Sequence, residues 1–179
     1  MIIYTDIISG DEIIADTYKI EPSKDCPILW EADCRKYTKK VGEDFQLEGA
    51  NPSAEEAEEE SGEGEYKMVH DIEDQFRLNW LKSEEGDKPS KDAFKAHLKT
   101  YLKNVNNQLK KDGKEAESKE FMGGAAAAMK KILANYDNYD VLMGESMNGD
   151  AMHVLIDFRD DGVTPFATVW KHGLKETKV

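Results

Sequence analysis

The middle of the chain carries two consecutive amphipathic helix patterns, and the segments on both sides of them have strand character. Between residues 89 and 136, apolar residues recur every three or four positions, which is the period of a helix with one buried face. Ser90 suits the start of the first helix, and Asp112-Gly113 suits its end, because glycine accepts the left-handed conformation that follows many helices. The short link between the two patterns predicts an antiparallel helical hairpin, and we expect Gly123-Gly124 to mark a close helix–helix approach. The apolar positions are Phe94, Leu98, Tyr101, Leu102, Val105 and Leu109, followed by Phe121, Met122, Ala125, Met129, Ile132, Leu133 and Tyr136.

Strand patterns occupy both ends of the chain, so the sheet has to combine segments from before and after the hairpin. We predict a β core from residues 1–40, 66–80 and 138–172, with a β-hairpin at the amino end. The alternation from Tyr66 to Trp80 predicts a strand, and Val163–Trp170 is the last strand predicted, with Pro165 placing its start at a sheet edge. The sequence therefore predicts one α+β domain over residues 1–179.

Acidic residues are concentrated in one segment that lacks large apolar side chains. Ten acids and no lysine or arginine lie between Glu43 and Glu65. Such a segment buries too little apolar surface to offset the loss of chain entropy, so residues 41–65 are predicted to form a mobile acidic loop. The alternative is a short acidic helix over residues 54–60, which like charges at i,i+4 disfavour.

Charge and hydropathy exclude several classes of protein. The net charge of −13 makes nucleic acid a poor partner, because the phosphate backbone binds lysine and arginine. No apolar run approaches the ~20 residues that span a bilayer. The first residues, Met1 to Asp6, lack the basic start of a signal peptide, so we expect a cytoplasmic protein.

No set of residues predicts catalysis or a tightly held metal. The four histidines are scattered along the chain, and no motif anchors a catalytic triad. Cys26 and Cys34 do not form a C-x-x-C pair, so we expect buried thiols rather than a zinc site, although one disulfide is arithmetically possible. Asp160-Asp161-Gly162 and Asn148-Gly149-Asp150 do not extend to an EF-hand and are interpreted as turns. We therefore expect no enzyme activity and no tightly bound cofactor.

Several separated motifs resemble those of the translationally controlled tumour protein family. The similarity runs through nearly the whole chain in the same order. The motifs are Met1-Ile2-Ile3-Tyr4, Tyr18-Lys19-Ile20, Gly49-Ala50-Asn51-Pro52-Ser53-Ala54-Glu55, Lys131-Ile132-Leu133-Ala134-Asn135-Tyr136, Met143-Gly144-Glu145-Ser146-Met147 and Asp160-Asp161-Gly162-Val163-Thr164-Pro165.

The resemblance implies a fold and a set of functions. The implied fold is a β-tent (Mss-like) core, similar to small Rab-binding nucleotide-release proteins, with a protruding helical hairpin and a mobile acidic loop. The implied functions are those of a multifunctional cytosolic regulator. They comprise calcium binding, microtubule binding, growth control through the small GTPase Rheb and the TOR pathway, and protection from apoptosis or stress.

The resemblance also carries over individual residues. Glu12 matches a glutamate implicated in contact with the GTPase, and Asn138, Asp140 and Asp157 match positions proposed for weak calcium binding. A serine that is phosphorylated in animal members is Gln46 here, which puts kinase regulation of that type in doubt. The lysine-rich first helix corresponds to a tubulin-binding region, and its lysines recur every four residues: Lys91, Lys95, Lys99 and Lys103.

Each of these sites has a simpler interpretation. Four lysines on one helix face are commonly only solvated, and Glu12 would be an ordinary solvated turn acid. Asn138, Asp140 and Asp157 could share an ion only if two strands bring them together. An alternative function is that of a chaperone-like stress-response binder, without activity toward a GTPase, that holds exposed hydrophobic segments in a groove of the β-tent.

Overall fold

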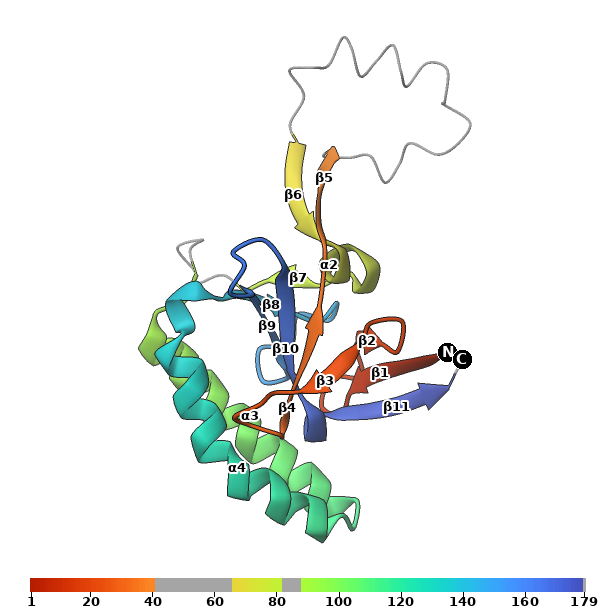
Figure 1. Ribbon diagram of the computed structural model, residues 1–179. Helices are drawn as coiled ribbons and strands as arrows, with labels where there is room; N and C mark the ends of the chain where they lie inside the picture. The colour runs from red at the N-terminus through yellow and green to blue at the C-terminus, as the bar shows by residue number, and fades with distance from the viewer. Residues whose placement is uncertain (41–65, 82–87, 179) are drawn as a thin grey trace.

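The computed structural model describes residues 1–40, 66–81 and 88–178, and the predicted acidic loop over 41–65, with Gln46, lies outside the described residues. Antiparallel sheets and a long helical hairpin make up the described part, which confirms the predicted α+β class (Figure 1). The sheets have the strand orders β11-β1-β2, β3-β4-β10-β9-β8-β7 and β5-β6. The strands are β1 (Ile2–Asp6), β2 (Glu12–Ala15), β3 (Ile20–Pro22), β4 (Leu29–Asp33), β5 (Lys36–Lys40), β6 (Tyr66–His70), β7 (Asn79–Trp80), β8 (Asp140–Met143), β9 (His153–Phe158), β10 (Pro165–Trp170) and β11 (Leu174–Lys178).

The two ends of the chain meet in one small sheet. β1 pairs antiparallel with β2, as the predicted amino-terminal hairpin requires. Its other edge pairs with β11, with Ile2 opposite Lys178, so the termini lie side by side (Figure 1). β11 was not predicted: its sequence, LKETK, is mostly exposed and gives no apolar alternation, and backbone pairing with β1 is what defines it.

The prediction of one strand from Tyr66 to Trp80 is wrong in its middle. β6 ends at His70, and the helix α2 (Asp71–Phe76) follows before β7. The Glu73 carboxylate accepts a hydrogen bond from the His70 amide at 3.4 Å at the start of α2, and acidic side chains in the first turn complement the helix dipole. Ile72 and Phe76, four residues apart, are both buried, which fits a helix as well as the predicted alternation.

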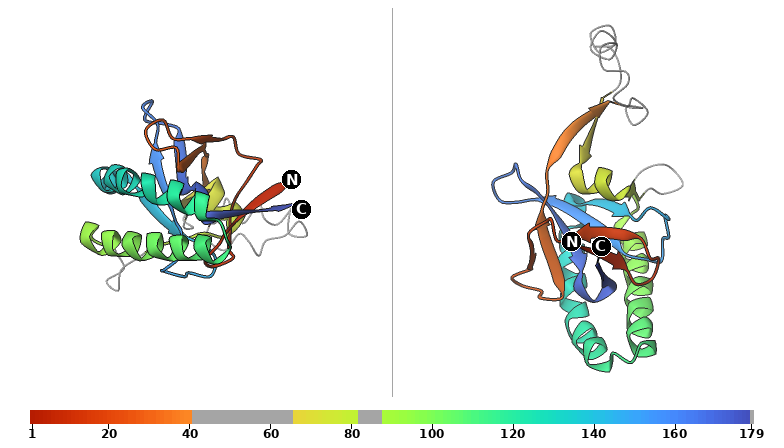
Figure 2. Two further views of the ribbon diagram at one scale, coloured as in Figure 1. Left: turned by 90° about the horizontal axis from the view of Figure 1, so that it is seen from below. Right: turned by 90° about the vertical axis from the view of Figure 1, so that its right-hand side faces the viewer.

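The hairpin consists of α3 (Lys91–Lys111) and α4 (Glu115–Ala134), followed by the 3₁₀ helix η3 (Tyr136–Asn138). The Ser90 hydroxyl accepts a hydrogen bond from the Ala93 amide at 3.2 Å, and Gly113 turns the chain with a φ of 76°. Figures 1 and 2 show the two helices antiparallel, with their loop end beyond the sheets.

Gly123-Gly124 does not mark a helix–helix approach, as we expected. A Cβ on Gly124 would lie 3.2 Å from the Ile28 side chain, which belongs to the turn between β3 and β4. A Cβ on Gly123 would meet nothing within 4 Å. The close approach that glycine permits here is therefore between α4 and the sheet.

The core lies between the hairpin and the six-stranded sheet. Trp170 of β10 is buried against Tyr101 of α3 and Phe121 of α4, with ring centroids 6.1 and 5.8 Å apart. Pro165 begins β10, but that strand lies inside the sheet between β4 and β9, so the predicted edge position is wrong. Proline is tolerated as the first residue of a strand, and its carbonyl still accepts a hydrogen bond from the Cys34 amide.

Candidate functional site

The outer face of α3 carries a row of exposed lysines. The apolar face of the helix is buried on the sheet, and an exposed lysine occurs every four residues along a row that flanks this buried face. None of these lysines forms an ion pair with any residue in the described ranges 1–40, 66–81 and 88–178. We call this row the lysine stripe, and it consists of Lys91, Lys95, Lys99 and Lys103.

Lys88, just before α3, has a different role from the lysine stripe. Its ammonium group donates hydrogen bonds of 2.6 Å to the carbonyls of Tyr136 and Tyr139 and lies 4.1 Å from the centroid of the Tyr136 ring. Partial burial lowers the pKa of Lys88, and the carboxylates of Asp137 and Asp140 oppose that shift. Lys88 therefore fastens the start of α3 to the segment that follows α4.

Glu12 is exposed and is the first residue of β2, rather than a turn residue as we expected. The neighbouring Asp11 is fixed by a distant loop: its carboxylate accepts hydrogen bonds from the Ser146 hydroxyl at 2.6 Å and from the Ser146 amide at 3.2 Å. A Cβ on Gly144 would overlap the Asp11 side chain, so glycine is required there for this contact. The backbone that presents Glu12 is therefore anchored to the loop after β8.

The structure does not bring the three predicted calcium ligands together. Asp140 lies opposite Ile156 in the pairing of β8 with β9, so the next residue, Asp157, points to the other face of the sheet. The Asp140 carboxylate lies 3.1 Å from the Nε2 atom of His70, which is fully buried. Asn138 is exposed at the end of η3. Calcium binding stays a prediction, and this geometry does not support one site shared by all three residues.

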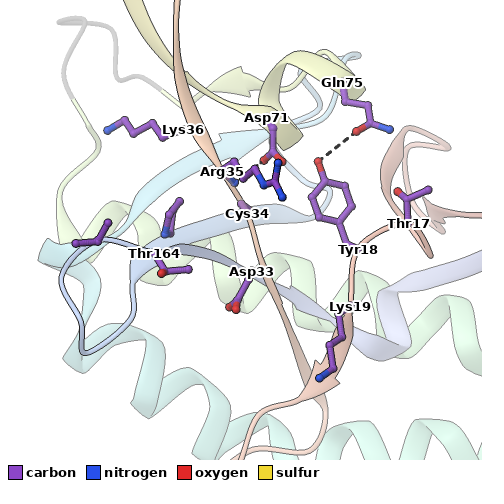
Figure 3. Close-up of a pocket in the computed structure, with 12 residues that line it drawn as sticks. Thr17, Tyr18, Lys19, Asp33, Cys34, Arg35, Lys36, Asp71, Gln75 and Thr164 are labelled. Carbon is purple, nitrogen blue, oxygen red and sulfur yellow. Dashed lines mark hydrogen bonds between the residues drawn. The ribbon is translucent and has the colours of Figure 1, made fainter.

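A polar cleft of about 840 Å³ lies where β4 continues into β5, beside α2 (Figure 3). Lys19, Arg35 and Lys36 contribute its cations. Lys19 pairs with Glu21 at 3.2 Å, whereas neither Arg35 nor Lys36 forms an ion pair with a described residue. Sequence reasoning missed this cleft, and the only signal was a pair of adjacent cations in an acidic chain. The lining residues are Thr17, Tyr18, Lys19, Asp33, Cys34, Arg35, Lys36, Asp71, Gln75, Val163, Thr164 and Pro165.

The cleft can donate and accept hydrogen bonds, and its thiol and phenol both stay protonated. Burial raises the pKa of the Cys34 thiol to about 12, and the nearby Asp71 carboxylate acts in the same direction, so the thiol stays protonated. Burial likewise raises the pKa of the Tyr18 phenol, whose hydroxyl donates to Gln75 at 3.2 Å. Both cysteines are free and buried, as the sequence predicts.

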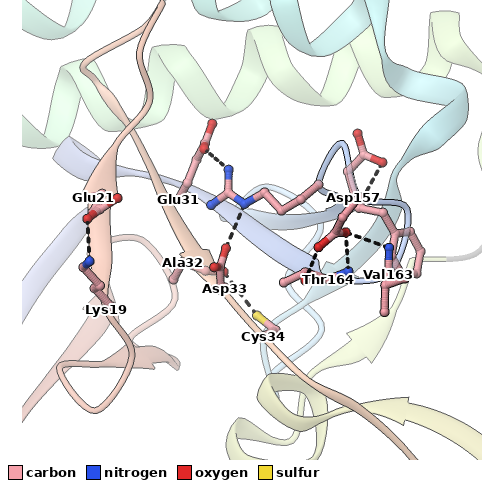
Figure 4. Close-up of polar contacts among 12 residues, drawn as sticks. Lys19, Glu21, Glu31, Ala32, Asp33, Cys34, Asp157, Val163 and Thr164 are labelled. Atoms are coloured by element: carbon pink, nitrogen blue, oxygen red, sulfur yellow. Dashed lines mark hydrogen bonds and ion pairs between the residues drawn. The ribbon is translucent and has the colours of Figure 1, made fainter.

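One wall of the cleft is held by an arginine that bridges two carboxylates of β4. Arg159 donates from Nη1 to Glu31 at 2.7 Å and from Nε to Asp33 at 2.8 Å, and its guanidinium lies 4.0 Å from the centroid of the Phe166 ring (Figure 4). Lys131 of α4 approaches Glu31 from the other side at 3.7 Å. These contacts connect the turn after β9 to β4 and to the hairpin.

A second groove, of about 470 Å³, lies between the loop end of the hairpin and the sheet of β1 and β11. Its apolar lining residues are Tyr4, Ile7, Trp30, Leu109 and Leu174. Charged residues of both signs also line it, including Lys114, Glu117, Lys175 and Glu176. This groove could accept an amphipathic segment, because apolar and charged side chains both line it.

The histidines form no acid–base pair with a nucleophile in the part of the chain that the structure describes. His70 and His172 each contact a carboxylate, but the Nδ1 atom of each ring has no hydrogen-bond partner there. Among the same residues, no three His, Cys, Asp or Glu side chains cluster as metal ligands. Within the described ranges, no helix has the length and apolarity needed to cross a membrane.

Comparisons with known proteins give matches along the full chain. A profile of the translationally controlled tumour protein family matches residues 1–175. The chain is 68% identical to a homologue from Aspergillus fumigatus and covers all of both sequences. It is similar to the solved structure of a Schizosaccharomyces pombe translationally controlled tumour-associated protein, with a TM-score of 0.76, 38% identity and full coverage of both chains. The Caenorhabditis elegans protein gives a TM-score of 0.64 at 27% identity and covers 100% of this chain and 99% of that one.

Proposed function

This chain belongs to the translationally controlled tumour protein family, and from that premise we propose that it is a binding protein that docks onto acidic macromolecular surfaces through its lysine stripe. Tubulin is the partner that this chemistry fits best. The protein acts in the cytosol, where free thiols such as Cys26 and Cys34 stay reduced. It works by association with other macromolecules and carries out no bond-making of its own.

This proposal rests on one observation: four exposed lysines, with no ion-pair partner among the described residues, lie in one row on a protein of net charge −13. An i,i+4 row advances ~6 Å per lysine along the helix, so the stripe is roughly 18 Å long. The buried apolar face holds the helix in place, so the charges are presented by a rigid element. A positive row of this kind accelerates encounter with an acidic surface and loses strength as salt rises.

Microtubule co-sedimentation tests this proposal. Lys91, Lys95, Lys99 and Lys103 are all changed to glutamate in the test variant. The matched control changes Lys24, Lys119, Lys130 and Lys178, which are exposed lysines outside the stripe, so that both variants have the same net charge. We expect the stripe variant to lose binding and the control to keep most of it, and binding of the wild type should fall between low and high salt. Equal binding by the two variants would contradict the proposal.

Contact of Glu12 with a small GTPase of the Rheb type is a second proposed function. The anchoring of Asp11 on Ser146 favours it, because a fixed backbone presents the exposed Glu12 carboxylate in a defined position. Through that contact the protein would influence growth signalling by the TOR pathway and survival under stress. A pull-down with Rheb compares the wild type, Glu12→Val and the control Asp16→Val. Unchanged binding and nucleotide exchange for Glu12→Val would count against this contact.

A chaperone-like role remains the alternative, and the groove with apolar lining residues such as Tyr4 and Trp30 favours it. Suppression of aggregation of a denatured client protein distinguishes it from the docking proposal. Trp30→Ala should reduce such suppression, whereas the stripe variant should not.

A further inference from the structure

His153, the first residue of β9, is a buried imidazole without polar partners. Its side chain is 3% exposed, and neither ring nitrogen has a hydrogen bond with any residue in the described ranges. Buried polar groups are nearly always hydrogen-bonded, because an unpaired one carries the full cost of its desolvation. An unpaired imidazole in this position indicates a partner that the described chain does not supply.

The imidazole of His97, on helix α3, packs against the His153 ring. His97 of α3 is half-buried, and its ring centroid is 5.6 Å from that of His153, with the ring planes at 74°. Two imidazoles bound to one tetrahedral zinc ion, with Zn–N bonds of ~2.0–2.1 Å, have centroids roughly 5 Å apart. The observed separation is therefore close to that of a shared metal ion, and the partial exposure of His97 gives the ion a route from solvent.

We propose that His97 and His153 bind a zinc ion between α3 and β9. Imidazole nitrogen suits zinc and other borderline divalent metals, whereas calcium prefers oxygen ligands. No third His, Cys, Asp or Glu side chain completes a cluster in the described ranges, so water molecules fill the remaining coordination positions. The site is accordingly open and binds zinc less tightly than a four-ligand structural site.

The surroundings suit a neutral, metal-binding ring. Burial lowers the pKa of His153 to about 4, and nearby His97 acts in the same direction, so at neutral pH the His153 ring keeps a free lone pair. The loop at Gly149 passes close to His97: a Cβ built on that glycine would lie 3.9 Å from the His97 Cε1 atom. Zinc at this position would link the helix that carries the lysine stripe directly to the central sheet.

Calorimetric titration of the full chain with zinc chloride tests the proposal, with two-dimensional NMR to locate the ion. We expect one zinc ion per chain, chemical-shift changes centred on residues 97 and 153, and a higher melting temperature with zinc. His97→Gln should weaken binding at least tenfold, and circular dichroism checks that α3 is intact. His153→Leu fills the same buried space without a nitrogen ligand and should also lose the zinc response.

His172→Gln is the matched control, because His172 lies beside a carboxylate, with Nε2 3.6 Å from Glu120, and could also attract zinc. It should bind zinc like the wild type. Unchanged zinc affinity in His97→Gln, or loss of binding in His172→Gln, would overturn the proposal. Calcium chloride added at the same concentrations should leave the resonances of both proposed ligands unshifted.

Discussion

The Asp11 carboxylate accepts hydrogen bonds from both the hydroxyl and the amide of Ser146, a residue 135 positions further along the chain. This contact joins the amino-terminal sheet to the loop between β8 and β9. It also fixes the residue next to Glu12, so the proposed contact of Glu12 with a small GTPase depends on its strength.

Asp11→Ala should lower the free energy of unfolding by about 1–2 kcal/mol, because a charged acceptor with two donors is removed at a partly exposed position. Urea denaturation monitored by tryptophan fluorescence measures the change. Asp16→Ala, at an exposed aspartate, serves as the control and should change stability by less than about 0.5 kcal/mol. Equal effects of the two substitutions would show that the contact between Asp11 and Ser146 does not contribute to stability.

Gly144→Ala should be destabilising only while Asp11 is present. The added Cβ overlaps the Asp11 side chain, and such crowding typically costs about 1–3 kcal/mol. Asp11→Ala would leave the Cβ of residue 11, 2.7 Å from the added Cβ, whereas Asp11→Gly removes every atom of the overlap. In the Asp11→Gly background the cost of Gly144→Ala should therefore fall by at least about 1 kcal/mol. A double-mutant cycle measured in urea provides the coupling energy, and additive effects would refute the packing explanation.

His153 should make the protein less stable in acid. Its pKa is about 4 in the folded state and near 6.5 when unfolded, so the unfolded chain binds the extra proton first as pH falls. The penalty therefore begins below about pH 6.5 and reaches about 3 kcal/mol near pH 4. The free energy of unfolding of His153→Leu minus that of the wild type should increase as the pH falls from about 6.5 to about 4. Burial raises the pKa of Asp6 in both proteins, so its contribution cancels, and a constant difference would contradict the assignment.

Arg159→Lys should destabilise the protein, because lysine cannot make the contacts of the native arginine. A lysine ammonium cannot reproduce the two directed hydrogen bonds to Glu31 and Asp33 and stack on Phe166 at the same time. The guanidinium is partly exposed, so we expect a loss of about 1 kcal/mol. Thermal unfolding measures it, with Arg77→Lys as the control because the ion pair of Arg77 with Glu145 is exposed. A full rescue by lysine would disprove the geometric argument.

We expect a bound calcium ion to contact only one of the two strand carboxylates, Asp140 or Asp157. Asp140 and Asp157 point to opposite faces of the sheet, so an ion at either one cannot use both. We expect weak binding, in the ~10⁻⁴–10⁻³ M range typical of sparse oxygen sites. NMR titration should show that Asp157→Asn removes the shifts and Asp140→Asn retains them, because Asp140 already contacts His70. Loss of the calcium-induced shifts in both variants would instead support one site shared by the two carboxylates.

The local patterns predicted most elements correctly but failed where long-range pairing outweighed them. The hairpin helices, the amino-terminal β-hairpin and the strand that ends at Trp170 follow from local sequence patterns. β11 was missed because an exposed strand has no apolar pattern, and α2 was missed because Ile72 and Phe76 fit both a helix and a strand. Pro165 was assigned to an edge because its chain neighbours do not reveal that β4 lies beside β10.

The sequence by itself determined the α+β class, the helical hairpin and the presence of four lysines on one helix face, because these depend on residues a few positions apart. Only the tertiary structure decided that Asp140 faces His70 and not Asp157, that Asp11 meets Ser146, and that His97 covers His153. Those contacts join residues that are 56 to 135 positions apart and belong to different elements. Strand register and helix docking set them, and neither follows from the local apolar pattern of a segment.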